Sequence, residues 1–189
     1  GCVKLDGIDL RNIKQGSLRS VMAIVPQKTV LFAGTIFENI AYGKPGATHD
    51  DVVLAERAAG AHECIMSKLD GYSTLVGERG AMLSGGQAQR IAIARALICK
   101  PRVLILDEAT SALDSGKEAA VQDAIRAGRH DRTTLVVAHR LSTIVDADRI
   151  VVMQAGSIVE IGTHDVLVAA GGVYARLVET QLRGEGGES

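Results

Sequence analysis

The chain has 189 residues, of which 47% are hydrophobic, 23% charged and 3% aromatic. The hydrophobic fraction is large enough to bury a core, which excludes wholesale disorder, and the length predicts a single domain. Lys and Arg number 21 against 22 Asp and Glu, with no basic block, so the concentrated positive charge that non-specific nucleic-acid binding needs is missing. No apolar run approaches the roughly 18 residues that span a bilayer.

Three further features bound the context of the chain. The cysteines, Cys2, Cys64 and Cys99, are widely spaced and odd in number. They match neither a disulfide framework nor a metal-ligand spacing, which indicates a reducing compartment. Residue 1 is Gly rather than Met, and there is no signal peptide, so we expect a piece of a longer chain or a processed one.

Residues 1–35 predict a small antiparallel β piece. Asp6-Gly7 lies between two short apolar stretches, which is a strong signal for a tight hairpin. The compact apolar run Val21–Val25 is stopped by Pro26 and predicts a buried strand.

Residues 36–99 predict a helical subdomain. Thr48 is a suitable N-cap, and Gly60 predicts a break between two helices. One apolar helix face is predicted from residues that recur at three- and four-residue steps, namely Leu54, Ala58, Ala61, Ile65 and Leu69. A glycine-rich loop over 77–86 leads into a helix over 87–98 that is apolar nearly all round, so we expect that helix to be buried.

Residues 100–182 alternate between strands and helices. The predicted strands are Arg102–Leu106, Thr133–Val137 and Ile150–Met153, and Ser115 with Glu118 forms a capping box for an intervening helix. Strands buried on both faces and separated by helices predict right-handed βαβ crossovers, a parallel sheet and an α/β fold. The Gly- and Glu-rich residues 183–189 predict a disordered tail.

Polar residues follow two of these strands where each strand ends. Asp107-Glu108 closes one strand, and His139 closes the next. Ligands bind outside the carboxyl ends of parallel strands, so we expect these side chains to face one crevice. The first carboxylate can hold Mg²⁺ and the second can polarise an attacking water. The alternative is that the acidic pair only caps a strand or the next helix.

The string Leu83-Ser84-Gly85-Gly86-Gln87 opens the buried helix. Ser84 can cap this helix, and the glycines allow backbone N–H groups to approach an anion without Cβ clashes. A phosphate there meets free donors and the positive end of the helix dipole. The alternative is a glycine-rich turn that merely starts a helix.

Together these strings resemble the nucleotide-binding domain of ATP-binding cassette (ABC) transporters, over residues 1 to about 182. LSGGQ at 83–87 is similar to the family signature, LILDE at 104–108 to Walker B, SALD at 111–114 to the D-loop, and His139 in VVAHRLSTI to the switch histidine. Gln27 in VPQ is similar to the Q-loop glutamine. Three further strings resemble the multidrug, peptide and lipid exporter branch: LFAGTIFENIAYG at 31–43, VGERG at 76–80 and VVMQAGSIVEIGTH at 151–164.

This resemblance implies a truncated P-loop NTPase fold, with a RecA-like parallel sheet, a helical subdomain and a small antiparallel β piece. It also implies that two such domains sandwich two ATP molecules head to tail. Ser84, Gly85, Gly86 and Gln87 would then bind the ATP held mainly by the partner domain, with Ser84 and Gly86 on its γ-phosphate. Asp114 would communicate across the dimer, for which the alternative is a simple helix cap.

The resemblance also implies catalytic roles. Asp107 and Gln27 would bind Mg²⁺, Glu108 would activate water, and His139 would stabilise charge on the γ-phosphate. Gln27 could instead be a solvated loop residue, and His139 could only satisfy backbone carbonyls. The segments around Gln27 and Glu78-Arg79 would meet the transmembrane domains at the cytoplasmic face of the membrane. For Glu78-Arg79 the alternative is a local surface ion pair.

One departure from the family pattern matters for activity. The sequence contains no G-x-x-x-x-G-K-[ST], and Gly43-Lys44-Pro45-Gly46 is not one, because no Ser or Thr follows the lysine and Pro45 lacks an N–H. A P-loop supplies several charge-assisted hydrogen bonds to ATP. Without them the binding free energy for ATP is weaker by on the order of 5 kcal/mol, which lowers the affinity at least about a thousandfold. We therefore predict that this chain alone neither binds ATP tightly nor hydrolyses it, and that its sheet has an exposed apolar edge.

Two functions from different classes follow. The first is the ATPase module of an exporter that couples ATP binding and hydrolysis to transport. The second is a non-hydrolytic module that supplies LSGGQ in trans to an intact partner domain. A DNA-repair or chromosome-organising ATPase is disfavoured, because the sequence has neither long heptads nor a basic face.

Overall fold

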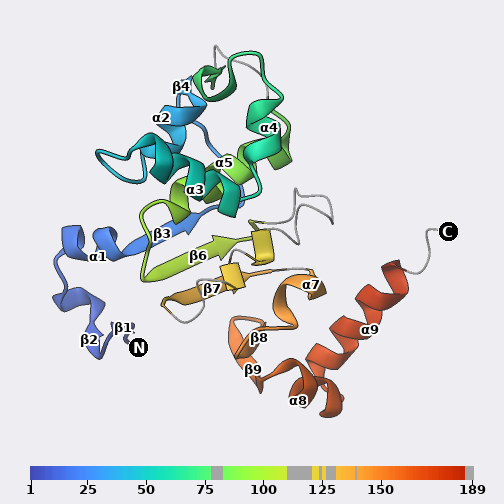
Figure 1. Ribbon diagram of the computed structural model, residues 1–189. Coiled ribbons are helices and arrows are strands. Elements are labelled where there is room, and N and C mark those ends of the chain that lie inside the picture. Colours follow the sequence, from blue (N-terminus) through green and yellow to red (C-terminus); the bar gives the residue numbers. More distant parts are fainter. Residues whose placement is uncertain (78–82, 110–120, 124, 127–130, 139, 186–189) are drawn as a thin grey trace. The chain divides into compact units, whose positions relative to one another are not determined.

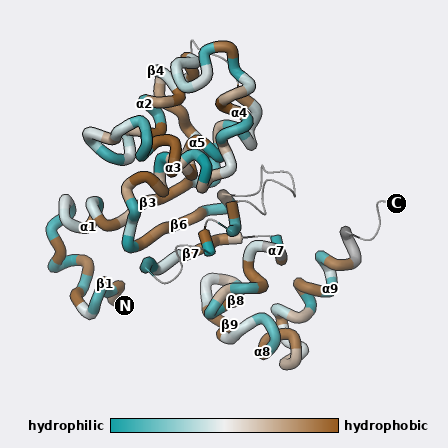
Figure 2. The backbone as a smooth tube through the Cα atoms, viewed as in Figure 1, coloured by the Kyte–Doolittle hydropathy of each residue, from teal (hydrophilic) through white to brown (hydrophobic). Residues whose placement is uncertain are grey.

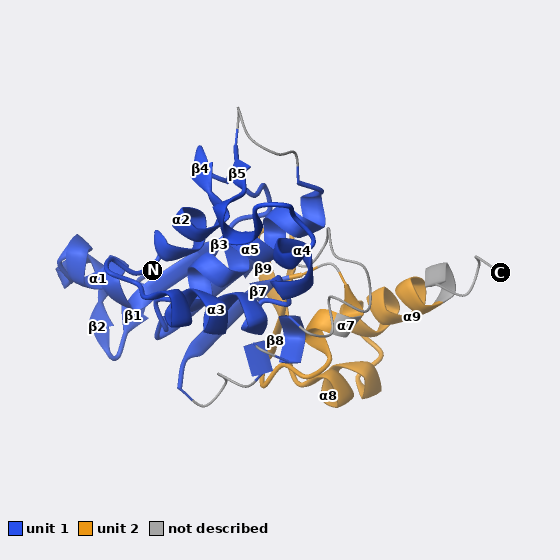
Figure 3. Cartoon of the chain, turned by 45° about the horizontal axis from the view of Figure 1, so that its top comes forward, with its two compact units in different colours: residues 1–137 blue, residues 138–189 orange. Residues whose placement is uncertain are grey.

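The computed structural model describes residues 1–77, 83–109, 121–123, 125–126, 131–138 and 140–185 (Figure 1). The chain forms two compact units, residues 1–137 and 138–189, and each is described by itself (Figure 3). A parallel sheet, a group of helices and small antiparallel sheets together confirm the predicted α/β fold class. The boundaries of the parts 1–35, 36–99 and 100–182 stay a prediction.

The first unit begins with the predicted hairpin. β1 (Lys4–Leu5) pairs antiparallel with β2 (Ile8–Asp9). Asp6 and Gly7 have φ angles of +49° and +82°. Positive φ at both central residues is what a two-residue hairpin turn of the favoured twist requires. A short 3₁₀ turn, η1 (Leu10–Asn12), follows.

The prediction for the next segment was wrong in two respects. Within the predicted β piece over 1–35, the residues before β3 form a helix, α1 (Gln15–Val21). The strand β3 (Met22–Val25) therefore starts one residue late, and it belongs to the parallel sheet rather than to an antiparallel piece. Val21 is the last residue of α1, so the apolar run Val21–Val25 is divided between α1 and β3.

The parallel sheet has three strands in the order β3-β6-β7, where β6 is Val103–Asp107 and β7 is Thr133–Val137. Val25 is aligned with Leu106, and Asp107 with Val137. Leu104 and Leu106 on the central strand are 0% and 2% exposed. Figure 2 shows the hydrophobic residues along β3 and β6. This register brings the carboxyl ends of the three strands to one edge of the sheet.

The strand predicted over 150–153 is present, and within the described residues it pairs with one strand only. β8 (Ile150–Gln154) pairs antiparallel with β9 (Ser157–Gly162) in the second unit. The expectation that the parallel strands are buried on both faces fails for β7. Within the described residues β7 pairs only with β6, and Leu135 and Val137 are 56% and 47% exposed. Among the described residues, β7 therefore forms an edge of the sheet with exposed apolar side chains, as the predicted exposed apolar edge requires.

Residues 36–99 are mostly helical, as predicted. A short pair of antiparallel strands, β4 (Gly34–Thr35) and β5 (Leu75–Val76), accompanies the helices. The helical elements are α2 (Ile36–Ala41), α3 (His49–Ala58), α4 (His62–Met66), the 3₁₀ turn η2 (Gly71–Ser73) and α5 (Gly85–Leu97). Thr48 caps α3, and Gly60, at φ +62°, separates α3 from α4, as predicted.

The predicted apolar face of these helices was only partly right. Ala61 and Ile65 are buried, but Leu54 is 70% exposed and Leu69 is 105% exposed. The buried side of α3 carries Val52 and Ala55, and Ala59 directly after the helix is also buried. Leu54 lies on the exposed side of the same helix. Leu69 follows the end of α4, where no helical periodicity holds it on the core side.

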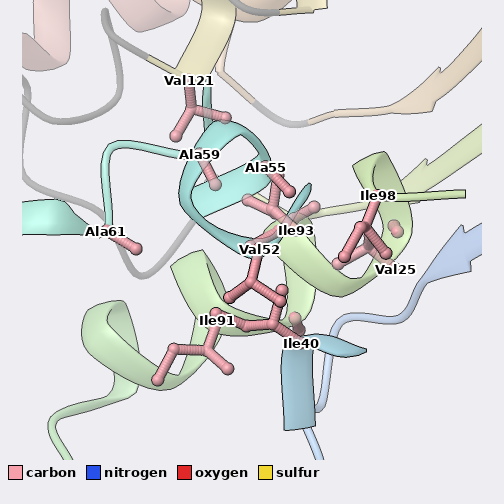
Figure 4. Packing of buried hydrophobic residues seen from close by; sticks show 14 of the residues in the cluster. Val25, Ile40, Val52, Ala55, Ala59, Ala61, Ile91, Ile93, Ile98 and Val121 are labelled. Atoms are coloured by element: carbon pink, nitrogen blue, oxygen red, sulfur yellow. The ribbon is translucent and has the colours of Figure 1, made fainter. Parts of the chain in front are cut away.

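The core of the first unit forms around α5. Figure 4 shows Val52, Ile40 and Ile91 converging from α3, α2 and α5. As predicted, α5 is buried nearly all round, from Gln89 to Ala94 and again at Ala96.

The second unit packs α7 (Leu141–Ile144), the β8–β9 hairpin, α8 (His164–Ala169) and α9 (Val173–Glu185). Its core consists of Ile150, Val152, Leu167, Tyr174 and Val178. α9 runs past the predicted end at Leu182, so part of the expected tail is helical. The predicted capping box at Ser115 and Glu118 lies outside the described residues. Within the described part of the chain, no helix has the length and apolar character to cross a membrane.

Asp51 supplies a pH-dependent part of the stability. Lys44 at 2.7 Å and then the Thr48 N–H lower the pKa of its carboxyl from 3.8 to about 2. A group with a lowered folded-state pKa stabilises the fold above its unfolded pKa and loses that effect as pH falls through the folded value. The stability advantage of the wild type over Asp51→Asn is therefore expected to be full above about pH 4 and to vanish below about pH 2. Urea unfolding across this range measures it, and a constant difference would contradict the assignment.

Candidate functional site

The signature string lies at the start of α5, as predicted. Ser84 is the N-cap, with φ −63° and ψ 157°. The Gln87 N–H donates to Ser84 Oγ at 3.3 Å, and the Ser84 N–H donates to Gln87 Oε1 at 3.2 Å. Gly85 and Gly86 are the first two residues of the helix. The reciprocal pair is a capping box, so the helix begins at a defined residue.

Glu108 follows directly after β6, and its backbone is unusual. Its φ is +48°, a left-handed conformation that non-glycine residues seldom adopt outside functional sites and turns. Its N–H donates to the Val137 carbonyl at 2.9 Å, which ties it to the end of β7. Asp107, the last residue of β6, is exposed.

The Glu108 carboxylate also meets the end of β3. The Gln27 side-chain amide Nε2 donates to Glu108 Oε2, and Gln27 lies two residues after β3. The contact joins residues that are 81 positions apart in the sequence. The structure thus brings together Gln27 and Glu108, and Asp107 precedes Glu108 in the chain. The catalytic and metal-binding roles of these residues stay a prediction.

The segment that carries Gln27 is tied to α5 as well. The Thr29 hydroxyl donates to the Gln89 side-chain oxygen. Arg95 Nη1 donates to the Val30 carbonyl at 3.0 Å, and the guanidinium lies 4.7 Å from the centroid of the Phe32 ring. The loop after β3 is therefore held by the same helix that begins with the signature string.

Asn39 completes this attachment, and sequence reasoning missed it. Its side chain is buried, accepts from the Phe32 N–H at 2.9 Å and donates to the Phe32 and Thr35 carbonyls. Arg95 donates to the Asn39 carbonyl and side-chain oxygen at 2.9 and 2.7 Å. A usable signal was present, because Asn39 stands on the apolar face of α2 beside Ile36 and Ile40.

Four of the predicted site residues are not described by the structure. Asp114 and His139 lie outside the described residues, and so do Glu78 and Arg79. Ser84, Gly85, Gly86 and Gln87 lie together at the start of α5. The oxygen atoms of Asp107, Glu108 and Gln27 are hard donors, which fit Mg²⁺ bound through one or two carboxylates and phosphate oxygens.

A cleft of about 670 Å³ lies beside the segment after β3. Its lining includes Pro26, Thr29, Phe32, Tyr42 and Arg95. Phe32 and Tyr42 are 46% and 69% exposed, and their ring centroids are 4.7 Å apart. Neither Ser84 nor Glu108 lines this cleft, so it is a surface separate from the carboxylate and signature sites.

A comparison with family models matches residues 1–111, more than half of the chain, to the model described as ABC transporter. The chain belongs to the ABC transporter family. This confirms the family that the sequence motifs indicated.

Curated relatives point to the same branch. The chain is 52% identical to ABC transporter B family member 2 of Dictyostelium discoideum and 51% identical to human ATP-binding cassette sub-family B member 6. It is 55% identical to the rat mitochondrial potassium channel ATP-binding subunit. In each case 96% of this chain is covered, but only 13%, 22% and 26% of the relative, respectively.

A solved structure of a bacterial Atm1-family ABC exporter with ATP bound is also similar. It superposes with a TM-score of 0.92 at 45% identity, covering 96% of this chain and 32% of the exporter chain. This likeness supports the predicted exporter type and the ABC ATPase fold.

The Gln27–Glu108 contact can be measured on the 189-residue chain. We expect Gln27→Ala and Glu108→Ala to be non-additive in unfolding free energy, with a coupling of about 1 kcal/mol for a hydrogen bond to a carboxylate. A double-mutant cycle by urea unfolding gives the value. Gln154→Ala, at an exposed position, replaces Gln27→Ala in the control cycle and is expected to show no coupling. Additivity in both cycles would contradict the contact.

Proposed function

We propose that this chain is the nucleotide-binding part of an ABC exporter and couples ATP binding and hydrolysis to transport across a membrane. The observation that carries the proposal is the contact between Gln27 and Glu108 at the carboxyl ends of parallel strands, in a chain that belongs to this family. The similarity to exporters supports this role rather than that of a non-hydrolytic module acting in trans.

Glu108 is the proposed general base. Its backbone is held by the hydrogen bond to Val137, and its carboxylate is oriented by the Gln27 amide. A carboxylate fixed in this way can take a proton from a water that attacks the γ-phosphate, so that the proton moves onto a Glu108 oxygen. Asp107 and the Gln27 side-chain oxygen would hold Mg²⁺, which when bound neutralises phosphate charge. His139 is proposed to stabilise negative charge on the γ-phosphate.

The signature string is the second proposed part of the ATP site, beside the carboxylate site. It would face an ATP held by another nucleotide-binding domain in a head-to-tail dimer. Ser84 and the glycines after it offer donors at the positive end of the α5 dipole. Asp114 is proposed to communicate between the two domains. The P-loop is proposed to come with a further parallel strand on the open edge of β7, where Leu135 and Val137 are exposed.

The cleft beside residues 26–32 is the proposed contact with the transmembrane domains. The proposed location of the chain is accordingly the cytoplasmic face of the membrane. Its exposed aromatic pair, Phe32 and Tyr42, offers apolar area to a docking segment. Thr29 and Val30 beside the cleft are hydrogen-bonded to Gln89 and Arg95 of α5. A displacement of the segment beside the cleft would therefore move the signature helix. Glu78-Arg79 is proposed to belong to the same contact.

A domain graft tests the proposal. Residues 1–182 replace the matching segment of the bacterial Atm1-family exporter, whose remaining segments supply the rest of the transporter. The wild-type graft is expected to hydrolyse ATP, and Glu108→Gln to lower kcat by about 10²–10⁴-fold while ATP still binds. Glu179→Gln, a matched change at an exposed site on α9, is expected to leave kcat unchanged.

The 189-residue chain by itself is expected to show no turnover, because it has no P-loop. A graft that binds ATP and folds but hydrolyses it equally well with Glu108→Gln would contradict the assignment of the general base. Turnover by the isolated chain at ordinary enzyme rates would contradict the account of the missing P-loop.

A further inference from the structure

The capping box at the start of α5 does more than begin a helix. An α-helix leaves its first four N–H groups without partners inside the helix. In α5 these belong to Ser84, Gly85, Gly86 and Gln87, since the next one, of Ala88, already donates to the Ser84 carbonyl at 3.0 Å. The box satisfies the N–H groups of Ser84 and Gln87. The box does not use the N–H groups of Gly85 and Gly86.

The box also determines what the Ser84 hydroxyl can do. Its oxygen accepts the Gln87 N–H at 3.3 Å, which fixes the position of Oγ. A serine hydroxyl has one proton and two acceptor sites, so the proton is still available for donation. Ser84 and Gly85 are exposed. Three donors that the box does not use, one O–H and two N–H, therefore lie at the positive end of the helix dipole.

We propose that Gln87 is a positioning residue for the signature site, acting through Ser84. Its side chain turns back to accept the Ser84 N–H at 3.2 Å, so its oxygen is occupied within the box. By holding Ser84 it keeps the hydroxyl and the glycine N–H groups in one arrangement. The inference rests on the proposed function, because it concerns the same phosphate-facing part of the proposed ATP site.

Two substitutions separate a positioning role from direct binding. Gln87→Glu keeps an acceptor for the Ser84 N–H, and a glutamate at this position completes a capping box equally well. Gln87→Leu has a similar size but no acceptor. If the Gln87 amide instead donated to phosphate, Gln87→Glu would be the more harmful change, because it would replace a donor with a like charge.

The first readout uses the full 189-residue chain and needs no nucleotide. Amide hydrogen exchange at Ser84 is expected to rise about fivefold in Gln87→Leu and to stay near the wild-type rate in Gln87→Glu. Gln154→Leu, the same change at an exposed residue without a capping role, serves as the matched control and leaves Ser84 unchanged. Unaltered exchange at Ser84 in Gln87→Leu would overturn the proposal.

The second readout is ATP hydrolysis in the graft. Gln87→Leu is expected to lower kcat/KM about tenfold, and Gln87→Glu to restore it to near the wild-type value. A value for Gln87→Glu at or below that of Gln87→Leu, or wild-type values for both, would overturn the positioning role. If the wild-type graft is inactive, the proposed function fails, and the exchange measurement still decides whether Gln87 holds Ser84.

Discussion

The parallel pairing of β3, β6 and β7 is the constraint on which the carboxylate site depends. β6 is central, and its Leu104 and Leu106 are buried. A shift of one residue would turn these side chains to the other face, so burial fixes the register. With that register, the ends of β3 and β6 lie side by side, and the Gln27 amide reaches the Glu108 carboxylate although 81 positions separate them.

The same loop links the carboxylate to the signature helix. Between Gln27 and Phe32, one contact goes to Glu108 and the others go to α5 and α2 through Thr29, Val30 and Phe32. Asn39 and Arg95 bury several hydrogen bonds in this junction, which makes it hard to deform locally. A displacement of the residues around the cleft beside Phe32 and Tyr42 would therefore shift both the Gln27–Glu108 contact and the start of α5, the two parts of the proposed ATP site.

The motifs and caps were predictable from the sequence because their information is local. Ser84 and Thr48 cap helices where their neighbours indicated, and Asp6-Gly7 forms its hairpin. What failed depended on tertiary context. The helix phase of α3 was misjudged because Glu56, a charged residue, occupies the buried side, where it pairs with His62 at 2.8 Å and accepts from Tyr72 at 3.0 Å.

Strand partners were equally hidden from local reading. The run over 150–153 forms the predicted strand, and its antiparallel pairing with β9 through the turn at Ala155-Gly156 appears only in the structure. The family resemblance implied separate roles for Gln27 and Glu108 but not the contact between them, which appears only in the folded structure. The roles of Thr29, Asn39 and Arg95 likewise appear only once the helices are packed.

The most direct test of the central claim is the solvent exchange of the Gln27 side-chain amide protons. Nuclear magnetic resonance of the ¹⁵N-glutamine-labelled chain compares them with those of Gln154, which is exposed, in the same sample. Exchange is expected to be about tenfold slower at Gln27 than at Gln154, and Glu108→Ala is expected to remove that difference. Equal exchange at the two residues in the wild type would show that the strand ends do not bring amide and carboxylate together.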